Sequence, residues 1–224
     1  MTETSFFHTF SDLDTFVKES VLSIELFLSE KLKQQPLVRV ALSGGSSPQP
    51  VYNALAKSTV IDWSRVELYL VDERYVPLDD PHSNYRMIQE TLAAHVPLEH
   101  FCYFDTDESI EDALEDYEAD LPDRFDLVLL GLGEDGHIAS LFPHSPALHS
   151  PERVLHTESE SGPIRDRLTL GLPMILNSEA VIFIVQGHNK MSVVEQFLHQ
   201  TGSIDELPAR TLLHHAQLQF YFLT

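Results

Sequence analysis

Residues 126–143 read DLVLLGLGEDGHIASLFP, an aliphatic run that passes directly into a glycine-rich turn. The run is short, continuous and apolar, which is typical of a strand buried on both faces of a parallel sheet. Its three glycines have the spacing G-x-G-x-x-G, and the residues after them resemble the start of a helix. Glycines at this spacing after a strand can cradle a dinucleotide, so the stretch first raises the question of a nucleotide cofactor.

Two features of the turn argue against a nucleotide. The motif lies in the middle of the chain, and Glu134 and Asp135 place two carboxylates where a pyrophosphate would bind. Like charges there would weaken binding. The turn is better suited to presenting Asp135 and His137 to a pocket, where the carboxylate orients or charges the imidazole so that it takes a proton from water. We therefore predict that His137 and Asp135 are catalytic.

Similar aliphatic runs recur along the chain and alternate with segments of helical periodicity. The predicted strands are 38–42, 66–71, 126–131, 180–185 and 218–223. The predicted helices are about 12–33, 48–57, 83–95, 109–120 and 189–199. This alternation predicts one α/β domain over residues 1–224. The domain should have three layers, with a mostly parallel, open, Rossmann-like sheet between two layers of helices. The stretch 143–163, rich in Pro, Ser and His, is expected to be a long and functional excursion.

The second candidate site follows the strand at 38–42. The residues Ser43-Gly44-Gly45-Ser46-Ser47 precede Pro48, which suits the first position of a helix, and Ser47 can cap that helix. Free backbone N–H groups at such a turn bind phosphate, although an ordinary strand-to-helix turn has the same composition. The loop lacks the lysine of a Walker motif, so a nucleoside triphosphate is not indicated.

A third group of polar residues ends the strand at 66–71. The predicted buried strand is followed directly by Asp72, Glu73 and Arg74. This position is the carboxyl edge of the sheet, where open α/β sheets bind ligands. They can simply pair with one another on a solvated loop, but their position at this edge favours a functional role.

Composition limits the partners. The chain has 14 Lys and Arg against 35 Asp and Glu, a formal net charge of -21. A surface this acidic repels nucleic-acid phosphates and anionic membranes, so we expect neither as a partner. A phosphorylated small molecule can still bind if a few of the scarce cations gather in one pocket. Nothing in the sequence indicates an obligate protein partner.

Cysteine and histidine usage gives further expectations. Cys102 is the only cysteine, which excludes an intrachain disulfide and fits a reducing compartment, and we interpret it as a buried small hydrophobe. The histidines at 137, 144 and 149 lack the paired helical spacing of a zinc enzyme, so we predict no catalytic metal and no cofactor. The start MTETSFFHTF has no basic segment followed by an apolar one, which predicts a cytoplasmic protein without a secretory signal.

Taken together, the motifs resemble one known family. ALSGGSSP (41–48), VDERYVPLDDPHSN (71–84) and LGLGEDGHIASLFP (130–143), in that order, closely resemble the 6-phosphogluconolactonases of the pentose phosphate pathway. The later segment RLTLGLPMILNSEAVIFIVQGHNK (167–190) agrees with the same family. The resemblance covers essentially the whole chain. It implies a fold of the glucosamine-phosphate deaminase and ribose-phosphate isomerase type, without a nucleotide.

The resemblance also implies a substrate and site residues. The substrate would be 6-phospho-D-glucono-1,5-lactone, hydrolysed by water that His137 activates, with Asp135 as its orienter. Arg74 is similar to the family's substrate-side arginine and would steady the oxyanion or the lactone oxygens. The phosphate and the rest of the substrate would contact residues of three segments, namely Ser43, Gly44, Gly45, Ser46, Asp72, Arg167 and Lys190.

Two alternatives remain at this point. Glucosamine-6-phosphate deaminases share the fold and the Asp-Gly-His turn, but their pattern resembles F-N-E-P with a glutamate five positions after the histidine, where this chain has Phe142. A sugar-phosphate sensor that binds through the glycine loop without chemistry is the other alternative. Such sensors are usually joined to a DNA-binding segment, and no basic helix-turn-helix pattern is visible.

Overall fold

The computed structural model describes residues 6–160 and 162–224, so the first five residues of MTETSFFHTF and Ser161 of the excursion lie outside the described residues. Its main feature is a seven-stranded sheet in which every neighbouring pair is parallel, in the order β1-β10-β9-β6-β2-β3-β5. The strands are β1 Phe7–Phe10, β2 Val38–Leu42, β3 Val66–Leu70, β5 His100–Cys102, β6 Leu127–Leu130, β9 Ala180–Gln186 and β10 Leu218–Leu223. All five predicted strands are confirmed, as is the parallel α/β class.

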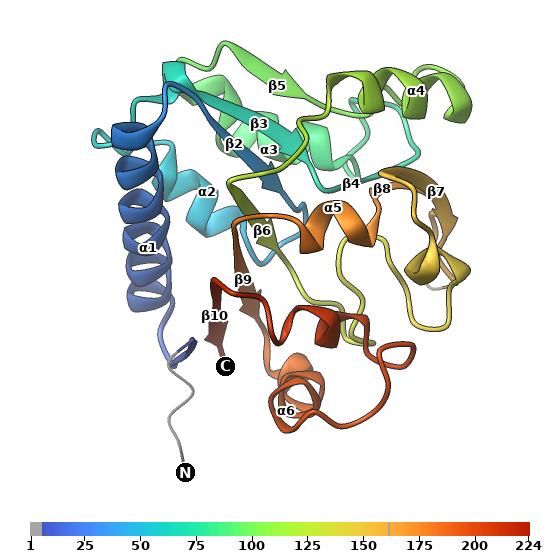
Figure 1. The fold of residues 1–224 in the computed structure, drawn as a ribbon. Coiled ribbons are helices and arrows are strands. Elements are labelled where there is room, and N and C mark those ends of the chain that lie inside the picture. The colour runs from blue at the N-terminus through green and yellow to red at the C-terminus, as the bar shows by residue number, and fades with distance from the viewer. Residues whose placement is uncertain (1–5, 161) are drawn as a thin grey trace.

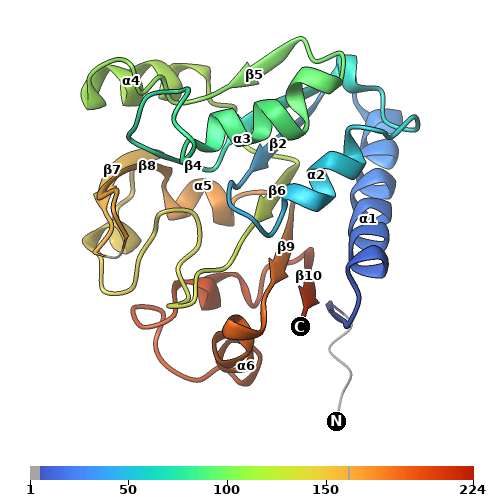
Figure 2. The ribbon, with the colours of Figure 1, turned by 180° about the vertical axis from the view of Figure 1, so that it is seen from behind.

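Helices cover both faces of this sheet. They are α1 Leu13–Gln34, α2 Gln49–Leu55, α3 Asn84–Thr91, α4 Ile110–Asp120, α5 Leu172–Leu176 and α6 Met191–His199. Figure 2 shows α2 and α3 in front of the sheet, whereas Figure 1 shows α5 in front of the opposite face. Short 3-10 helices occupy Trp63–Arg65, Ala93–His95, Pro146–His149, His188–Lys190 and Pro208–Leu212. None of the helices in the described part of the chain is long and apolar enough to cross a membrane.

Local sequence explains where the long helices begin. Asp12 caps α1 by accepting a hydrogen bond from the backbone N–H of Thr15 at 2.8 Å, and Ser83 and Ser109 cap α3 and α4 in the same way. Along α1 the buried residues recur every fourth position, at Phe16, Ser20, Ile24, Leu28 and Leu32. This stripe is the face that a surface helix buries against its sheet.

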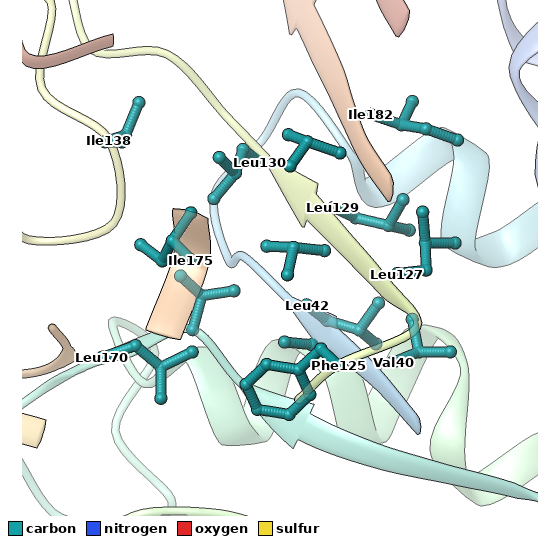
Figure 3. Close-up of a cluster of buried hydrophobic side chains, with 14 of the residues drawn as sticks. Val40, Leu42, Phe125, Leu127, Leu129, Leu130, Ile138, Leu170, Ile175 and Ile182 are labelled. Atoms are coloured by element: carbon teal, nitrogen blue, oxygen red, sulfur yellow. The ribbon is translucent and has the colours of Figure 1, made fainter. Parts of the chain in front are cut away.

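The core lies on both sides of β6. All four of its residues are buried, which is why the aliphatic run is continuous instead of alternating with polar residues. Figure 3 shows its side chains packed with Val40 and Leu42 of the neighbouring strand and with Ile175 of α5. Packing on two faces fixes the position at which β6 ends, and therefore the position of the glycine turn that follows.

A second, smaller sheet was not predicted. It is antiparallel and consists of β4 Asp72–Arg74, β8 Asp166–Leu170 and β7 Val154–Glu158, with β8 in the middle. The expectation that 143–163 is one long excursion is therefore partly wrong, because β7 lies within it. The helix-like start after the glycine turn is also wrong, since Ile138 and Leu141 form an isolated bridge and the next helical turn begins only at Pro146.

The strand order places a switch point between β2 and β6. From β2 the chain adds β3 and β5 on one side, and from β6 it adds β9 and β10 on the other. The turns after β2 and β6 consequently diverge and leave a crevice at the carboxyl ends, which is where open α/β sheets bind ligands. The two turns start side by side, because the N–H of Ser43 donates to the carbonyl of Leu129 at 3.0 Å.

Candidate active site

A pocket of about 350 Å³ lies at this switch point. Its wall contains eight of the ten predicted site residues: Ser43, Gly44, Gly45, Ser46, Asp72, Arg74, His137 and Lys190. The other two, Asp135 and Arg167, lie next to wall residues without lining the pocket themselves. Four segments that are far apart in the sequence are thus brought together by the carboxyl edge of one sheet.

The glycine loop after β2 is fixed by the end of β9. The side-chain amide of Gln186 donates to the carbonyls of Ser46 and Ser47, both at 2.9 Å. The prediction that Ser47 caps α2 is wrong, because its hydroxyl accepts from the backbone N–H of Gln186 at 3.2 Å and Pro48 takes the cap position without a side-chain bond. Gly45 has a φ of +95°, a conformation that favours glycine. The loop is therefore held in one shape by groups behind it.

Buried polar atoms face the pocket around Asp72. Its carboxylate accepts from the hydroxyl of Ser140 at 2.7 Å and from the side-chain amide of Asn84 at 3.3 Å. Among the described residues, the hydroxyl of Ser43 and the side-chain oxygen of Asn84 are buried and have no hydrogen-bond partner. Both residues line the pocket. Because unpaired buried polar atoms are costly, these two are suited to bind polar groups of a ligand.

Glu73 builds the frame that holds the neighbouring Arg74. Its buried carboxylate accepts from the backbone N–H groups of Arg74, Asn84 and Tyr85, each at 2.7 Å, and from the Ser83 hydroxyl at 3.0 Å. Burial raises the pKa of Glu73 to about 6, against these four hydrogen bonds. The alternative in which Glu73 and Arg74 pair on a solvated loop is not observed, since Glu73 joins β4 to the start of α3.

Arg167 and Lys190, two cations of the site, are partly buried. Arg74 and Arg167 are directly opposite each other in the β4–β8 pair. Burial, and then the charge of Arg74, lower the pKa of Arg167, whose buried Nε has no hydrogen-bond partner within the described structure. Burial also lowers the pKa of Lys190, although Glu134 opposes this. An anion bound here would relieve both the repulsion and the desolvation.

The predicted His137–Asp135 pair is formed. Nδ1 of His137 lies 2.6 Å from Oδ1 of Asp135, and the same oxygen accepts the backbone N–H of His137 at 3.1 Å. Burial alone would raise the pKa of Asp135, but the hydrogen bonds and charge of His137 outweigh it and hold the pKa below its ordinary value. The imidazole also packs against Phe142, with 4.9 Å between ring centroids. One ring nitrogen is thereby assigned to Asp135, which leaves Nε2 for the pocket.

Sequence reasoning missed several residues of the site. Asn84, Glu134 and Ala139 line the pocket, and Ser140 and Gln186 hold its parts together. Asn84 and Ser140 lie inside the motifs at 71–84 and 130–143. Nothing next to either residue in the sequence indicates that its partner is Asp72. Gln186 ends β9 and could have been found by asking which side chain follows each predicted strand at the carboxyl edge.

Comparison with known proteins identifies the family of this chain. A family model described as glucosamine-6-phosphate isomerases/6-phosphogluconolactonase matches residues 11–221. A 6-phosphogluconolactonase of Thermotoga maritima is 36% identical over 193 residues, which are 84% of this chain and 87% of the relative. A crystal structure of 6-phosphogluconolactonase from the same organism has a TM-score of 0.87 at 32% identity, covering 97% of this chain and 98% of that one. The corresponding structure from Shewanella baltica has a TM-score of 0.85 at 28% identity, covering 100% and 98%. The chain therefore belongs to the glucosamine-6-phosphate isomerase/6-phosphogluconolactonase family, and the relatives compared here are lactonases.

Proposed function

We propose that the protein hydrolyses 6-phospho-D-glucono-1,5-lactone to 6-phospho-D-gluconate in the oxidative pentose phosphate pathway, with His137 as general base. The observation that carries this proposal is the 2.6 Å contact between His137 and Asp135 beside a pocket that also contains the glycine loop and two cations. The lactone is an activated cyclic ester that already hydrolyses slowly in water. A positioned base and a polarised carbonyl are sufficient catalysts for such a substrate.

The reaction follows from the tautomer that Asp135 selects. Asp135 holds the proton on Nδ1 of His137, so Nε2 accepts a proton from water as the water oxygen attacks the lactone carbonyl carbon. Arg74 steadies the negative charge that develops on the carbonyl oxygen. The tetrahedral intermediate then collapses with cleavage of the bond to the ring oxygen, which takes the proton back from Nε2 and becomes a hydroxyl. The products are the carboxylate and one released proton.

The phosphate is bound away from the reacting carbon. The backbone of Gly44, Gly45 and Ser46 and the ammonium of Lys190 contact it, and Arg167 adds charge from beside Arg74. The hydroxyl of Ser43 and the Asp72 carboxylate bind sugar oxygens. Three of the 14 Lys and Arg residues in a chain with net charge -21 are thereby brought to one point.

Phe142 favours hydrolysis over deamination. It occupies the position at which the deaminase pattern has a glutamate, and its ring packs on His137. Without a carboxylate there, ring opening and amine loss lack a catalytic group. A sensor without chemistry, the other alternative, gives no reason for a histidine and a carboxylate paired at the pocket.

A coupled assay separates these functions. Fresh 6-phosphogluconolactone and unphosphorylated gluconolactone are supplied side by side, and release of the acid is compared with the spontaneous rate. We expect acceleration for the phosphorylated lactone and a much smaller effect on the other. A spontaneous rate for both would refute the lactonase, and ammonia release from glucosamine 6-phosphate would favour the deaminase.

Arg167→Ala is expected to raise KM about tenfold, because the positive charge beside the pocket attracts the substrate phosphate, and a tenfold change corresponds to about 1.4 kcal/mol. A phosphate contact remote from the carbonyl acts equally on ground and transition states, so kcat should change little. Steady-state kinetics test this.

The matched control for this variant is Arg165→Ala. Arg165 lies two residues earlier and is paired with Glu158 at 2.6 Å, so its removal should leave KM unchanged. A collapsed kcat with an unchanged KM in Arg167→Ala would instead place Arg167 at the reacting centre.

Chelators are expected to leave the initial rate unchanged, since the proposed steps need only protein groups and water. The rate is measured after exhaustive treatment with a chelator and again after adding back single divalent cations. Loss of activity that one cation restores, without a change in the thermal midpoint, would show that a metal takes part in the reaction.

A further inference from the structure

Three side chains of the types that bind metal ions lie together outside the pocket. His100 and Cys102 are two residues apart on β5, and so point to the same side of the strand, and Asp120 is the last residue of α4. One donor atom from each of the three lies within 4.8 Å of the others. The thiol Sγ of Cys102 is 4.0 Å from Oδ2 of Asp120. Neither the motifs nor the proposed reaction uses any of these residues.

These distances are close to those of a tetrahedral metal site. With zinc–sulfur and zinc–oxygen bonds of about 2.3 and 2.1 Å, two ligand atoms of a tetrahedral site lie about 3.6 Å apart. The sulfur and carboxylate oxygen, 4.0 Å apart, must therefore approach by only a few tenths of an ångström, and the imidazole nitrogen, within 4.8 Å of both, by at most about 1.2 Å. Thiolate, imidazole and carboxylate together are ligands that zinc accepts, whereas calcium and magnesium prefer oxygen alone.

The surroundings also favour a cation. Burial first, and then the negative charges of Asp120 and Glu67, raise the pKa of the Cys102 thiol to about 12, and a bound cation would offset these two charges. Tyr69 contacts the His100 ring edge-on, with 5.9 Å between centroids, and limits the positions that the imidazole can take. Cys102 is only 5% exposed, whereas Asp120 is exposed, so solvent can supply a fourth ligand from one side.

The group is remote from the switch point. β5 is the edge strand opposite to β1, and His100 and Cys102 pair with Glu67 and Tyr69, ahead of the end of β3 at Leu70. Figure 1 shows β5 and α4 together along this edge. We propose that His100, Cys102 and Asp120 bind one zinc ion, which fastens the C-terminal end of α4 to the edge of the sheet. This proposal is independent of the proposed function.

The single cysteine makes the test specific. Cobalt(II) replaces zinc as a spectroscopic probe, and a thiolate bound to it gives a charge-transfer absorption band; any such band must come from Cys102, because the chain has one cysteine. The full chain, kept reduced with a phosphine, is titrated with cobalt and then with zinc. We expect a band that saturates at one equivalent, disappears when zinc is added, and is absent in Cys102→Ser.

Further variants test the other two ligands. His100→Asn and Asp120→Asn should each weaken cobalt binding about tenfold or more, whereas the exposed His199→Asn, at the end of α6, should not change it. His137→Asn should retain the band, which separates this site from the pocket. Circular dichroism without metal shows that each variant is folded. Absence of a band in the folded parent, or a band that keeps its affinity in both His100→Asn and Asp120→Asn, would overturn the proposal.

Discussion

His137→Asn is expected to lower kcat about 10²- to 10⁴-fold while the affinity for 6-phosphogluconate stays close to that of the parent. Asparagine keeps a polar side chain of similar reach, but it cannot accept the proton of the attacking water. Binding should persist because the glycine loop, Arg74 and Lys190 are left in place. Single-turnover rates with fresh lactone measure the first quantity, and calorimetric titration with the product measures the second.

The pH dependence of kcat in the parent protein is a second test of the general-base role of His137. Only neutral His137 accepts a proton, so kcat should rise with pH as the imidazole loses its proton and then level off. The pKa of Asp135 is held below its ordinary value, so Asp135 remains a carboxylate throughout this range and does not produce the rise. His137→Asn should retain a small residual activity that does not show this rise with pH.

A second histidine–carboxylate pair provides the control. His149 lies 2.7 Å from Asp205 on the surface, in a pair much like that of His137 and Asp135 but outside the pocket wall. His149→Asn should leave kcat and its pH profile unchanged. If His137 only supports the turn, its replacement should lower the thermal midpoint and product affinity together and keep the parent's pH dependence. A near-normal kcat in stably folded His137→Asn would shift the base to Asp72 or Asp135.

Five of the seven strands of the main sheet were predictable because their signal is local, whereas the edge strands β1 and β5 were not predicted. Strands buried on two faces are continuous apolar runs, and β6 and β9 are buried along all or nearly all of their length. Parallel strands joined by helices then bring their carboxyl ends to one edge, so the contacts between the two glycine turns and Asp72 could be expected without knowledge of the strand order. Most of the pocket wall followed from this single rule.

The small sheet was not predictable for the opposite reason. β4 has three residues, and it pairs with β8 across more than ninety positions of sequence. A strand of three residues is too short to show a periodic pattern in the sequence. It forms because it pairs with a distant strand, and its composition alone does not predict it. The same distance concealed the juxtaposition of Arg74 and Arg167, because a sequence places two arginines on two segments without giving their register.

For Ser47 and Cys102, the residue type suggested a local role, but the structure shows that each residue has a neighbour distant in sequence that was not predicted. A serine before a proline is typical of a helix cap, but the end of β9 supplies a competing N–H that only tertiary structure brings near. Cys102 is buried as predicted, yet burial alone did not reveal that His100 and the end of α4 lie beside it. Long-range partners decided both cases.

Gly133, the middle glycine of the opening stretch, has a use that a nucleotide does not explain. A Cβ atom on Gly133 would lie 2.1 Å from Nδ1 of His137 and 2.6 Å from Oδ1 of Asp135, far inside van der Waals contact. Gly133 is therefore required by the close approach of the histidine–carboxylate pair. It is not among the residues with positive φ, so alanine there meets no backbone strain. The added methyl group acts chiefly through His137 and Asp135.

Gly133→Ala is expected to lower kcat about 10²-fold with a much smaller change in KM, because displacing a catalytic group by about 1 Å can cost a factor of that size. The double variant with His137→Asn isolates the cause: if the methyl group acts by moving His137, it should lower kcat no further once the imidazole is gone. Thermal midpoints of the single and double variants show whether folding is affected. A kcat near that of the parent, or a further hundredfold loss in the double variant, would contradict the view that Gly133 exists to let Asp135 hold His137 at the pocket.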